Sequence, residues 1–146
     1  MVRESTLSSH EIAEELRPVL LRIGHELRRE TELGVTSHQA TLLWLVKTRP
    51  GLSLRELARA QGISAPSLSA AVDRLEALGL IRRVRSTDDR RRVGLELTTE
   101  GRTTLRRVRA RRTTRLGNRL ARLSEEDRER IERALPALRS LLEMGE

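Results

Sequence analysis

The sequence predicts a mainly α-helical fold with one small β-hairpin. Through most of the 146 residues, apolar side chains recur at helical spacing, and several stretches open with helix-start signals. Within residues 81–97 the spacing changes to alternation, which is typical of a half-exposed strand. The composition of 37% hydrophobic and 34% charged residues fits a soluble, helix-rich protein, and the length fits a single domain.

Several predicted helices begin at a capping box, in which a hydroxyl side chain is followed three residues later by an acid or an amide. These boxes are Ser8–Glu11, Thr36–Gln39, Ser53–Glu56 and Ser124–Asp127. Pro18 and Pro136 interrupt the first and the last helix, and each is expected to kink its helix or to start a new segment. The expected helices cover about residues 9–32, 37–48, 54–61, 64–78, 98–123 and 125–143.

A β-hairpin is expected after the fourth helix, which Gly79 closes. Its strands cover residues 81–85 and 93–97, and apolar residues alternate with polar or small ones along the second strand. The loop between them, residues 86–92, has no two-residue Asn-Gly signal, so its register stays open.

The third and fourth helices are joined by a turn at Gly62 and together resemble a helix-turn-helix unit. In the fourth helix one side is apolar and is expected to face the core; it carries Leu68, Ala71, Val72 and Leu75. In such a unit the opposite face enters the major groove of DNA, while the preceding helix crosses the backbone. That opposite face carries Pro66, Ser69, Ala70 and Asp73, with Ser67 and Arg74 on its flanks.

Basic charge is concentrated in one part of the chain. Residues 82–122 carry 15 arginines and 4 acidic residues, a net charge of +11. Residues 1–81 are neutral overall, and residues 123–146 have a net charge of −3. A concentration of positive charge of this kind is expected where a polyanion docks.

The helix-turn-helix unit and the arginine-rich hairpin together predict a protein that binds double-stranded DNA. Arg55 and Arg59, one turn apart on the third helix, can reach phosphates. Arg90 and Arg91 at the hairpin tip can enter a narrow minor groove, with Asp89 holding one guanidinium in place. The fourth helix lacks a central Asn, Gln or Arg for bidentate base contacts, so we expect modest direct readout and a larger share from DNA shape. The candidate DNA-binding residues are Arg55, Arg59, Ser64, Ala65, Pro66, Ser67, Ser69, Ala70, Arg74, Asp89, Arg90 and Arg91.

The first and last helices carry apolar stripes that so small a chain cannot cover with a third layer. Pairing these helices between two copies would bury both stripes, and two-fold symmetry is the commonest arrangement of oligomers. We therefore expect a homodimer. The candidate interface residues are Ile12, Leu16, Leu20, Ile131, Leu135, Leu138 and Leu142.

The order of helices and hairpin, with the motifs AxxxGIS, VDRLEALGLI and DDRRRVGLELTTEG, resembles the MarR family of winged helix-turn-helix regulators. The resemblance covers nearly the whole chain and is strongest over residues 52–101. It implies a homodimer on a pseudo-palindromic operator, with the fourth helix in the major groove and the hairpin wing in the minor groove. Asp89 and Arg91 occupy the family's wing positions, although Ser86 and Asp88 replace its usual first Asp and Arg.

On this basis residues 1–146 are expected to form one MarR-like domain. Residues 1–35 and 124–146 are assigned to dimerisation, residues 36–98 to the DNA-binding lobe and residues 99–123 to a long connecting helix.

The resemblance also implies release from DNA by small phenolic or aromatic effectors, bound between the dimer helices and the DNA-binding lobe. The candidates for an effector site are His25, His38 and Trp44. At His25 a structural bond to the partner subunit is favoured, and Trp44 lies on a helix that is apolar nearly all round, which favours a core position. The absence of cysteine excludes the thiol-based peroxide sensing of one branch of the family.

The sequence gives little support to other classes of function. The chain has no catalytic or nucleotide-binding motif, so we expect no enzyme and no cofactor, and its three histidines lack metal-ligand spacing. No apolar run reaches the ~18 residues of a membrane span and no signal peptide is apparent, so a cytoplasmic protein is expected. RNA or single-strand binding is disfavoured, because Trp44 is the only aromatic residue available for stacking on bases. An architectural DNA-binding protein without an effector is the alternative that stays open.

Overall fold

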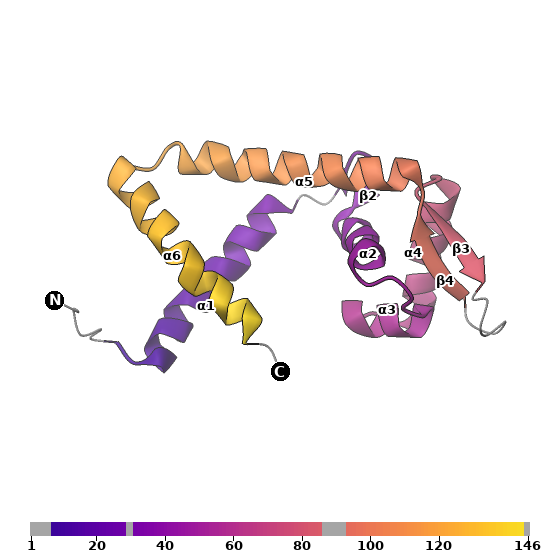
Figure 1. The fold of residues 1–146 in the computed structure, drawn as a ribbon, viewed down its shortest axis with the longest axis horizontal. Coiled ribbons are helices and arrows are strands. Elements are labelled where there is room, and N and C mark those ends of the chain that lie inside the picture. The colour runs from indigo at the N-terminus through magenta and orange to yellow at the C-terminus, as the bar shows by residue number, and fades with distance from the viewer. Residues whose placement is uncertain (1–6, 29–30, 86–92, 145–146) are drawn as a thin grey trace. The chain divides into compact units, whose positions relative to one another are not determined.

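The fold is described by a computed structural model, which covers residues 7–28, 31–85 and 93–144. Over these ranges the chain forms six helices and two two-stranded antiparallel sheets (Figure 1). The chain divides into two compact units, Met1–Ala110 and Arg111–Glu146, and α5 continues from the first into the second. In order, the elements are α1 (Ser9–Leu27), β1 (Thr31–Glu32), β2 (Val35–Thr36), α2 (Ser37–Thr48), α3 (Leu54–Gln61), α4 (Ala65–Ala77), β3 (Ile81–Arg85), β4 (Val93–Leu97), α5 (Thr99–Leu120) and α6 (Glu125–Glu143).

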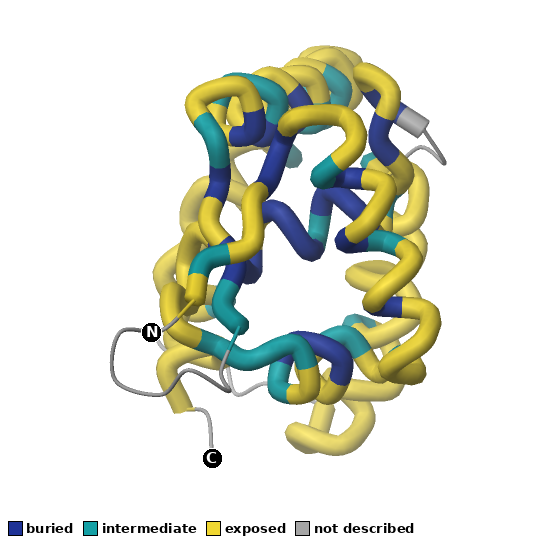
Figure 2. Tube along the Cα trace, turned by 90° about the vertical axis from the view of Figure 1, so that its right-hand side faces the viewer, coloured by how far each residue is buried: buried dark blue, intermediate teal, exposed yellow. Residues whose placement is uncertain are grey.

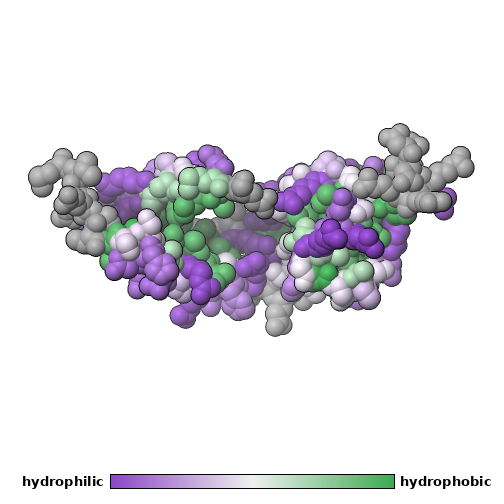
Figure 3. Space-filling view, turned by 90° about the horizontal axis from the view of Figure 1, so that it is seen from below, coloured by the Kyte–Doolittle hydropathy of each residue, from purple (hydrophilic) through white to green (hydrophobic). Residues whose placement is uncertain are grey.

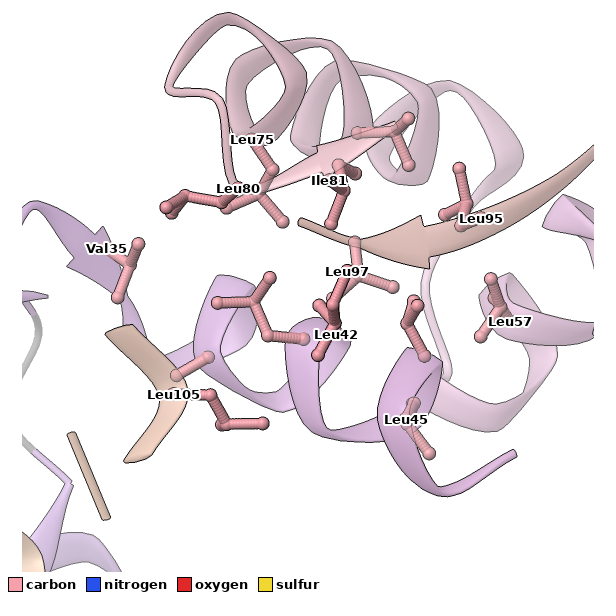
Figure 4. Packing of buried hydrophobic residues seen from close by; sticks show 14 of the residues in the cluster. Val35, Leu42, Leu45, Leu57, Leu75, Leu80, Ile81, Leu95, Leu97 and Leu105 are labelled. Atoms are coloured by element: carbon pink, nitrogen blue, oxygen red, sulfur yellow. The ribbon is translucent and has the colours of Figure 1, made fainter. Parts of the chain in front are cut away.

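One hydrophobic core joins the elements between Val35 and Val108 in the first unit (Figure 4). Its centre is α2, on which Leu42 and Leu43 are fully buried. Buried leucines of α3, α4, β4 and the start of α5 pack into the same cluster, and Figure 2 shows these buried stretches alternating with exposed ones along the chain. Because burial of apolar surface is the main stabilising term in folding, this shared core fixes α3, α4 and the hairpin as one platform.

The hairpin of β3 and β4 confirms the predicted strands. Its antiparallel register pairs Ile81 with Leu97 and Arg83 with Leu95. Alternate side chains point to opposite faces of a strand, so Ile81 and the leucines of β4 reach the core while Arg82 is exposed. The connecting residues 86–92 lie outside the described part of the chain.

The expected helix starts are present with their caps. At Ser8, Thr36 and Ser53 the side chain accepts a hydrogen bond from the backbone N–H three residues on, and the acid or amide there bonds back to the cap. At Ser124 the side chain accepts from the Asp127 N–H at 3.1 Å. These bonds satisfy backbone N–H groups that have no partner within the helix. Because they form between residues close in the chain, helix starts can be predicted from the sequence.

The first helix is shorter than expected: α1 ends at Leu27, not near residue 32. The backbone of Arg28 is extended, and the chain then forms β1 and β2, which pair across a two-residue turn at Leu33 and Gly34. Both turn residues have positive φ, 53° and 80°, as the tight hairpin turn that suits twisted strands requires. The sequence has Leu-Gly here, whereas such turns usually have Asn-Gly or Asp-Gly. Because leucine rarely adopts a positive φ, the sequence does not predict this turn.

The end of the fifth helix also needed correction. α5 ends at Leu120 rather than near residue 123. Of the two outcomes expected at Pro18 and Pro136, a new segment does not occur, because α1 and α6 continue through them; a kink at either proline stays a prediction.

The turn between α3 and α4 depends on Gly62, which adopts the left-handed conformation at φ 65°. Its N–H donates to the Arg59 carbonyl at 3.1 Å, and the Ile63 N–H donates to the Ala58 carbonyl at 3.1 Å. These bonds close the end of α3, and glycine allows the reversal without a Cβ penalty. The turn thereby sets the angle at which α4 leaves α3.

The terminal helices keep their apolar stripes at the surface. Neither α1 nor α6 contains a buried residue, and green apolar surface lies over these parts of the molecule in Figure 3. None of the helices in the described residues is long and apolar enough to cross a membrane.

Candidate nucleic-acid interface

The helix α4 has a buried face and an exposed face, as its sequence predicts. Leu68, Val72 and Leu75 are buried in the core. The opposite face is exposed at its first two turns, where small and hydroxyl side chains dominate. The exposed residues of this stretch are Ala65, Pro66, Ser67, Ser69 and Ala70. A small, smooth helix face of this kind can approach the edges of base pairs closely.

Ser64 caps α4 and orders its first turn. Its Oγ accepts from the Ser67 N–H at 3.2 Å and donates to the Ser67 Oγ at 2.8 Å. Pro66 in the same turn is compatible with the helix because the first N–H groups have no helical partner. The start of α4 is therefore held by these hydrogen bonds, and both serines are exposed.

Basic side chains flank this helix face. Arg55 and Arg59 are exposed on α3, one turn apart, and Arg74 is exposed on α4. Between α3 and α4 lies a groove of about 430 Å³ with a mainly apolar lining, including Ala58 and Ile63, and both α3 arginines line it. A duplex lying along α4 would meet these guanidinium groups at its phosphates.

The strand β3 adds further positive charge beside α4. Arg82 and Arg85 are exposed on it, and Arg82 bonds to Glu96 of β4 at 2.8 Å. The predicted wing-tip residues Asp89, Arg90 and Arg91 lie outside the described residues.

A cavity of about 630 Å³ lies between the end of α1, the start of α2 and the end of α3. It brings together His25 and His38, two of the three candidate effector residues. The Gln61 amide donates to the His38 carbonyl at 3.0 Å and ties α3 to α2 at the cavity wall. The full lining is His25, Arg28, Thr36, Ser37, His38, Thr41, Ala60 and Gln61.

The expected core position of Trp44 is wrong, because this side chain is 42% exposed. The helix α2 is apolar nearly all round, but its outward side carries Thr41, Trp44 and Thr48 one turn apart, and none of them is buried. Trp44 is not among the cavity-lining residues. Periodicity could not reveal its direction, since its neighbours on both sides are apolar.

Sequence reasoning missed the polar wall of this cavity. Arg28 follows the early end of α1, Thr36 ends the second strand of the unexpected β1–β2 hairpin, and Ser37 begins α2. The capping box at Thr36 was visible, but only the hairpin shows that it faces the end of α1. Among the described residues, no group of three or more His, Asp or Glu side chains is placed to hold a metal ion.

The candidate dimer residues lie at the surface of the terminal helices. Leu16 and Leu138 are partly buried, and the other candidates are exposed. Leu142 is the most exposed of them, at 84%. The exposed candidates are Ile12, Leu20, Ile131, Leu135 and Leu142.

Two helices joined by a glycine turn, followed directly by a β-hairpin on the same core, define a winged helix-turn-helix, a class of DNA-binding module. Residues 33–92 match the MarR family. The HTH-type transcriptional repressor MdtR of Bacillus subtilis is 32% identical over 113 residues, covering 77% of this chain and 73% of that protein. The chain belongs to the MarR family of DNA-binding transcriptional regulators.

Further relatives agree with this assignment. The HTH-type transcriptional regulator FarR of Neisseria gonorrhoeae is 36% identical over 70 residues, and the match spans about half of each chain, 48%. A crystal structure from Pseudomonas aeruginosa PA01 superposes with a TM-score of 0.77 at 30% identity, covering 92% of this chain and 95% of that one. A mutant of S. aureus MepR bound to an oligodeoxyribonucleotide shares the fold, with a TM-score of 0.64 at 24% identity, covering 90% and 97%.

Proposed function

We propose that this chain acts as a homodimeric, sequence-specific repressor that binds a pseudo-palindromic DNA operator and leaves it when a small effector binds. The observation that carries the proposal is the exposed start of α4, which shares a groove with the arginines of α3, while the arginine-bearing strand β3 contacts the second half of the same helix. Shape and charge there match the two requirements of DNA recognition, a helix for the major groove and cations for the phosphates. Because the partner is chromosomal DNA, we place the protein in the cytoplasm.

The parts of the chain receive distinct roles in this proposal. Residues 36–98 form the DNA-binding lobe, and residues 99–123 connect it to the dimerisation segments 1–35 and 124–146. The exposed apolar stripes of α1 and α6 support dimerisation, because large exposed apolar patches mark interaction sites. Repression is supported by the similarity to MdtR, which is a repressor by name.

In the proposed complex, the exposed residues of α4 read the major groove, with hydroxyl and methyl groups in place of bidentate readers. Ser64, Ser67 and Ser69 donate to bases or phosphates, and Ala65 and Ala70 pack on thymine methyl groups. Arg55, Arg59 and Arg74 contact phosphates. Asp89, Arg90 and Arg91 form the wing tip, where the arginines enter the minor groove.

Replacing Arg59 with alanine tests this docking. We expect the affinity for every duplex to fall by a similar factor and the salt slope of binding to decrease by about one, because a phosphate contact carries no sequence information. The measurement is fluorescence anisotropy at several salt concentrations. Arg17→Ala on α1 removes the same charge at an exposed position and serves as the control. An unchanged slope in Arg59→Ala would contradict the docking.

One observation favours an architectural DNA-binding protein instead: the first two turns of α4 contain no Asn, Gln or Arg. An architectural protein would bind with little sequence preference and strong salt dependence. Sequence preference therefore decides between the two functions.

The cavity at the start of α2 is the proposed effector site. Its lining combines the guanidinium of Arg28, two imidazoles and three hydroxyl groups, a donor set that suits a small organic anion. Occupation of the cavity would press on α2 and on the end of α3, which carries Gln61. Because α2 is the centre of the core that supports α4, such a shift would reach the DNA-binding face.

Benzoate, an aromatic anion, is a suitable probe for this site. We expect benzoate to release the protein from its duplex, and we expect Arg28→Ala to raise the required concentration at least fivefold. Arg22→Ala on the same helix is the control, because Arg22 does not line the cavity. Equal release from Arg28→Ala and Arg22→Ala would contradict the site, and no release from the parent protein would contradict the effector class.

A further inference from the structure

Arg83 on β3 connects the hairpin to the DNA-facing helix. Its Nη2 donates to the Asp73 Oδ1 at 2.6 Å, and its Nη1 donates to Glu76 Oε2. Asp73 and Glu76 lie one turn apart on α4, so a single guanidinium spans two carboxylates of the helix. These bonds run between secondary-structure elements, and they hold the strand against the helix.

The neighbouring Arg82 makes a different bond. It pairs with Glu96, its cross-strand partner on β4, and its side chain is 67% exposed against 33% for Arg83. Successive side chains of a strand point to opposite faces, which is why adjacent arginines reach different partners. The ion pair of Arg82 thus joins the two strands of the hairpin, whereas the ion pairs of Arg83 join the hairpin to α4.

The position of Asp73 on α4 gives this connection a role in DNA binding. Asp73 lies one helical turn after Ser69, on the side of α4 proposed to face DNA. Its hydrogen bond is the main cause that raises the pKa of Arg83, with Glu76 adding to it and burial opposing it. Arg83 therefore stays charged, and its two Nη groups donate to carboxylates of the protein.

We propose that Arg83 is a positioning residue for DNA recognition, which fixes the angle between α4 and the hairpin so that both can engage one duplex. This inference rests on the proposed DNA-binding function. A recognition helix and a wing act together only if both are held close to their productive geometry, and a displacement of about 1 Å loses much of the gain. The wing contributes to specific binding only while Arg83 is bonded to Asp73 and Glu76.

Direct phosphate contact by Arg83 is the competing role, and the contacts argue against it. With Asp73 and Glu76 the cluster has a net charge of −1, which repels phosphates. Arg82, which has one acidic partner and greater exposure, is the better phosphate ligand of the two.

The test compares Arg83→Ala with Arg82→Ala in the full chain, since both remove one positive charge from β3. Affinities are measured for the duplex that the parent protein selects from random DNA and for an unrelated duplex. We expect Arg83→Ala to lower the affinity for the selected duplex at least tenfold and that for the unrelated duplex by less than threefold. We expect Arg82→Ala to lower both by a similar small factor. Equal behaviour of the two variants would overturn the proposal.

Two further variants separate geometry from charge and from folding. Arg83→Lys keeps the charge and one contact, and it should recover part of the selected-duplex affinity. The triple variant Arg83→Ala, Asp73→Asn, Glu76→Gln removes the uncompensated carboxylates; restoration of parent affinity by this variant would overturn the positioning role. Thermal melting should show that all variants fold, because ion pairs near the surface add little to the free energy of unfolding. A parent protein that selects no sequence would refute the proposed function and this inference together.

Discussion

Replacing Gly101 with alanine is expected to lower the free energy of unfolding by about 3 kcal/mol, because it forces overpacking at a backbone contact. A Cβ at this position would lie 1.9 Å from the Leu80 carbonyl oxygen and 2.9 Å from its carbonyl carbon. Both atoms are backbone, so no side chain can rotate away.

The contact belongs to a junction that joins the turn after α4 to the start of α5. The Thr98 N–H donates to the Leu80 carbonyl at 3.0 Å, and the Thr98 hydroxyl donates to the Gly79 carbonyl at 2.6 Å. The same hydroxyl oxygen accepts from the Gly101 N–H at 3.0 Å. Pushing α5 away would break these bonds together.

Urea unfolding measures the effect, and Gly117→Ala is the matched control in the same helix. A Cβ at Gly117 meets nothing within 4 Å, so alanine there should stabilise the protein by roughly 0.5–1 kcal/mol through helix propensity. Opposite signs for the two substitutions are the expected result. Stabilisation by both would show that the junction opens without cost.

Replacing Leu142 with arginine is expected to dissociate the proposed dimer. Burying a leucine contributes ~1.5–3 kcal/mol, and two-fold symmetry doubles the loss to about 3 kcal/mol or more per dimer. Leu142 is 84% exposed in the single chain, so its replacement should leave the fold of the protomer intact. DNA affinity should fall when the dimer dissociates, since each protomer then binds its half-site alone.

Ser140→Arg is the control for this variant, because it adds the same charge on the opposite side of α6. Light scattering gives the mass, and anisotropy gives the affinity for DNA. The dimer model predicts a monomer with weak binding for Leu142→Arg and a dimer with parent-like binding for Ser140→Arg. A Leu142→Arg monomer that binds DNA as tightly as the parent would refute it.

Local signals in the sequence were sufficient for much of the fold. The capping boxes at Thr36 and Ser53, the glycine turn at Gly62 and the alternation along β4 each depend on neighbours in the chain. The buried face of α4 followed from periodicity for the same reason. Family resemblance then assigned the module, and the comparisons confirmed the family.

Features that depend on distant contacts were not predictable. The β1–β2 turn places a leucine at φ 53°, where propensity disfavours it, so tertiary structure overrides the local preference. Trp44 is exposed on a helix that is apolar nearly all round, so the pattern does not predict which side is exposed. The Arg83 bonds join residues ten and seven positions apart, across a turn whose geometry no spacing rule encodes.

Selection of binding sites from random duplex DNA tests the central claim most directly. A dimeric winged helix-turn-helix regulator should enrich an inverted repeat with half-sites about one helical turn apart, and its affinity for that repeat should exceed its affinity for unrelated DNA. Failure to enrich any motif, with binding that collapses as salt rises, would contradict sequence-specific regulation and favour the architectural function.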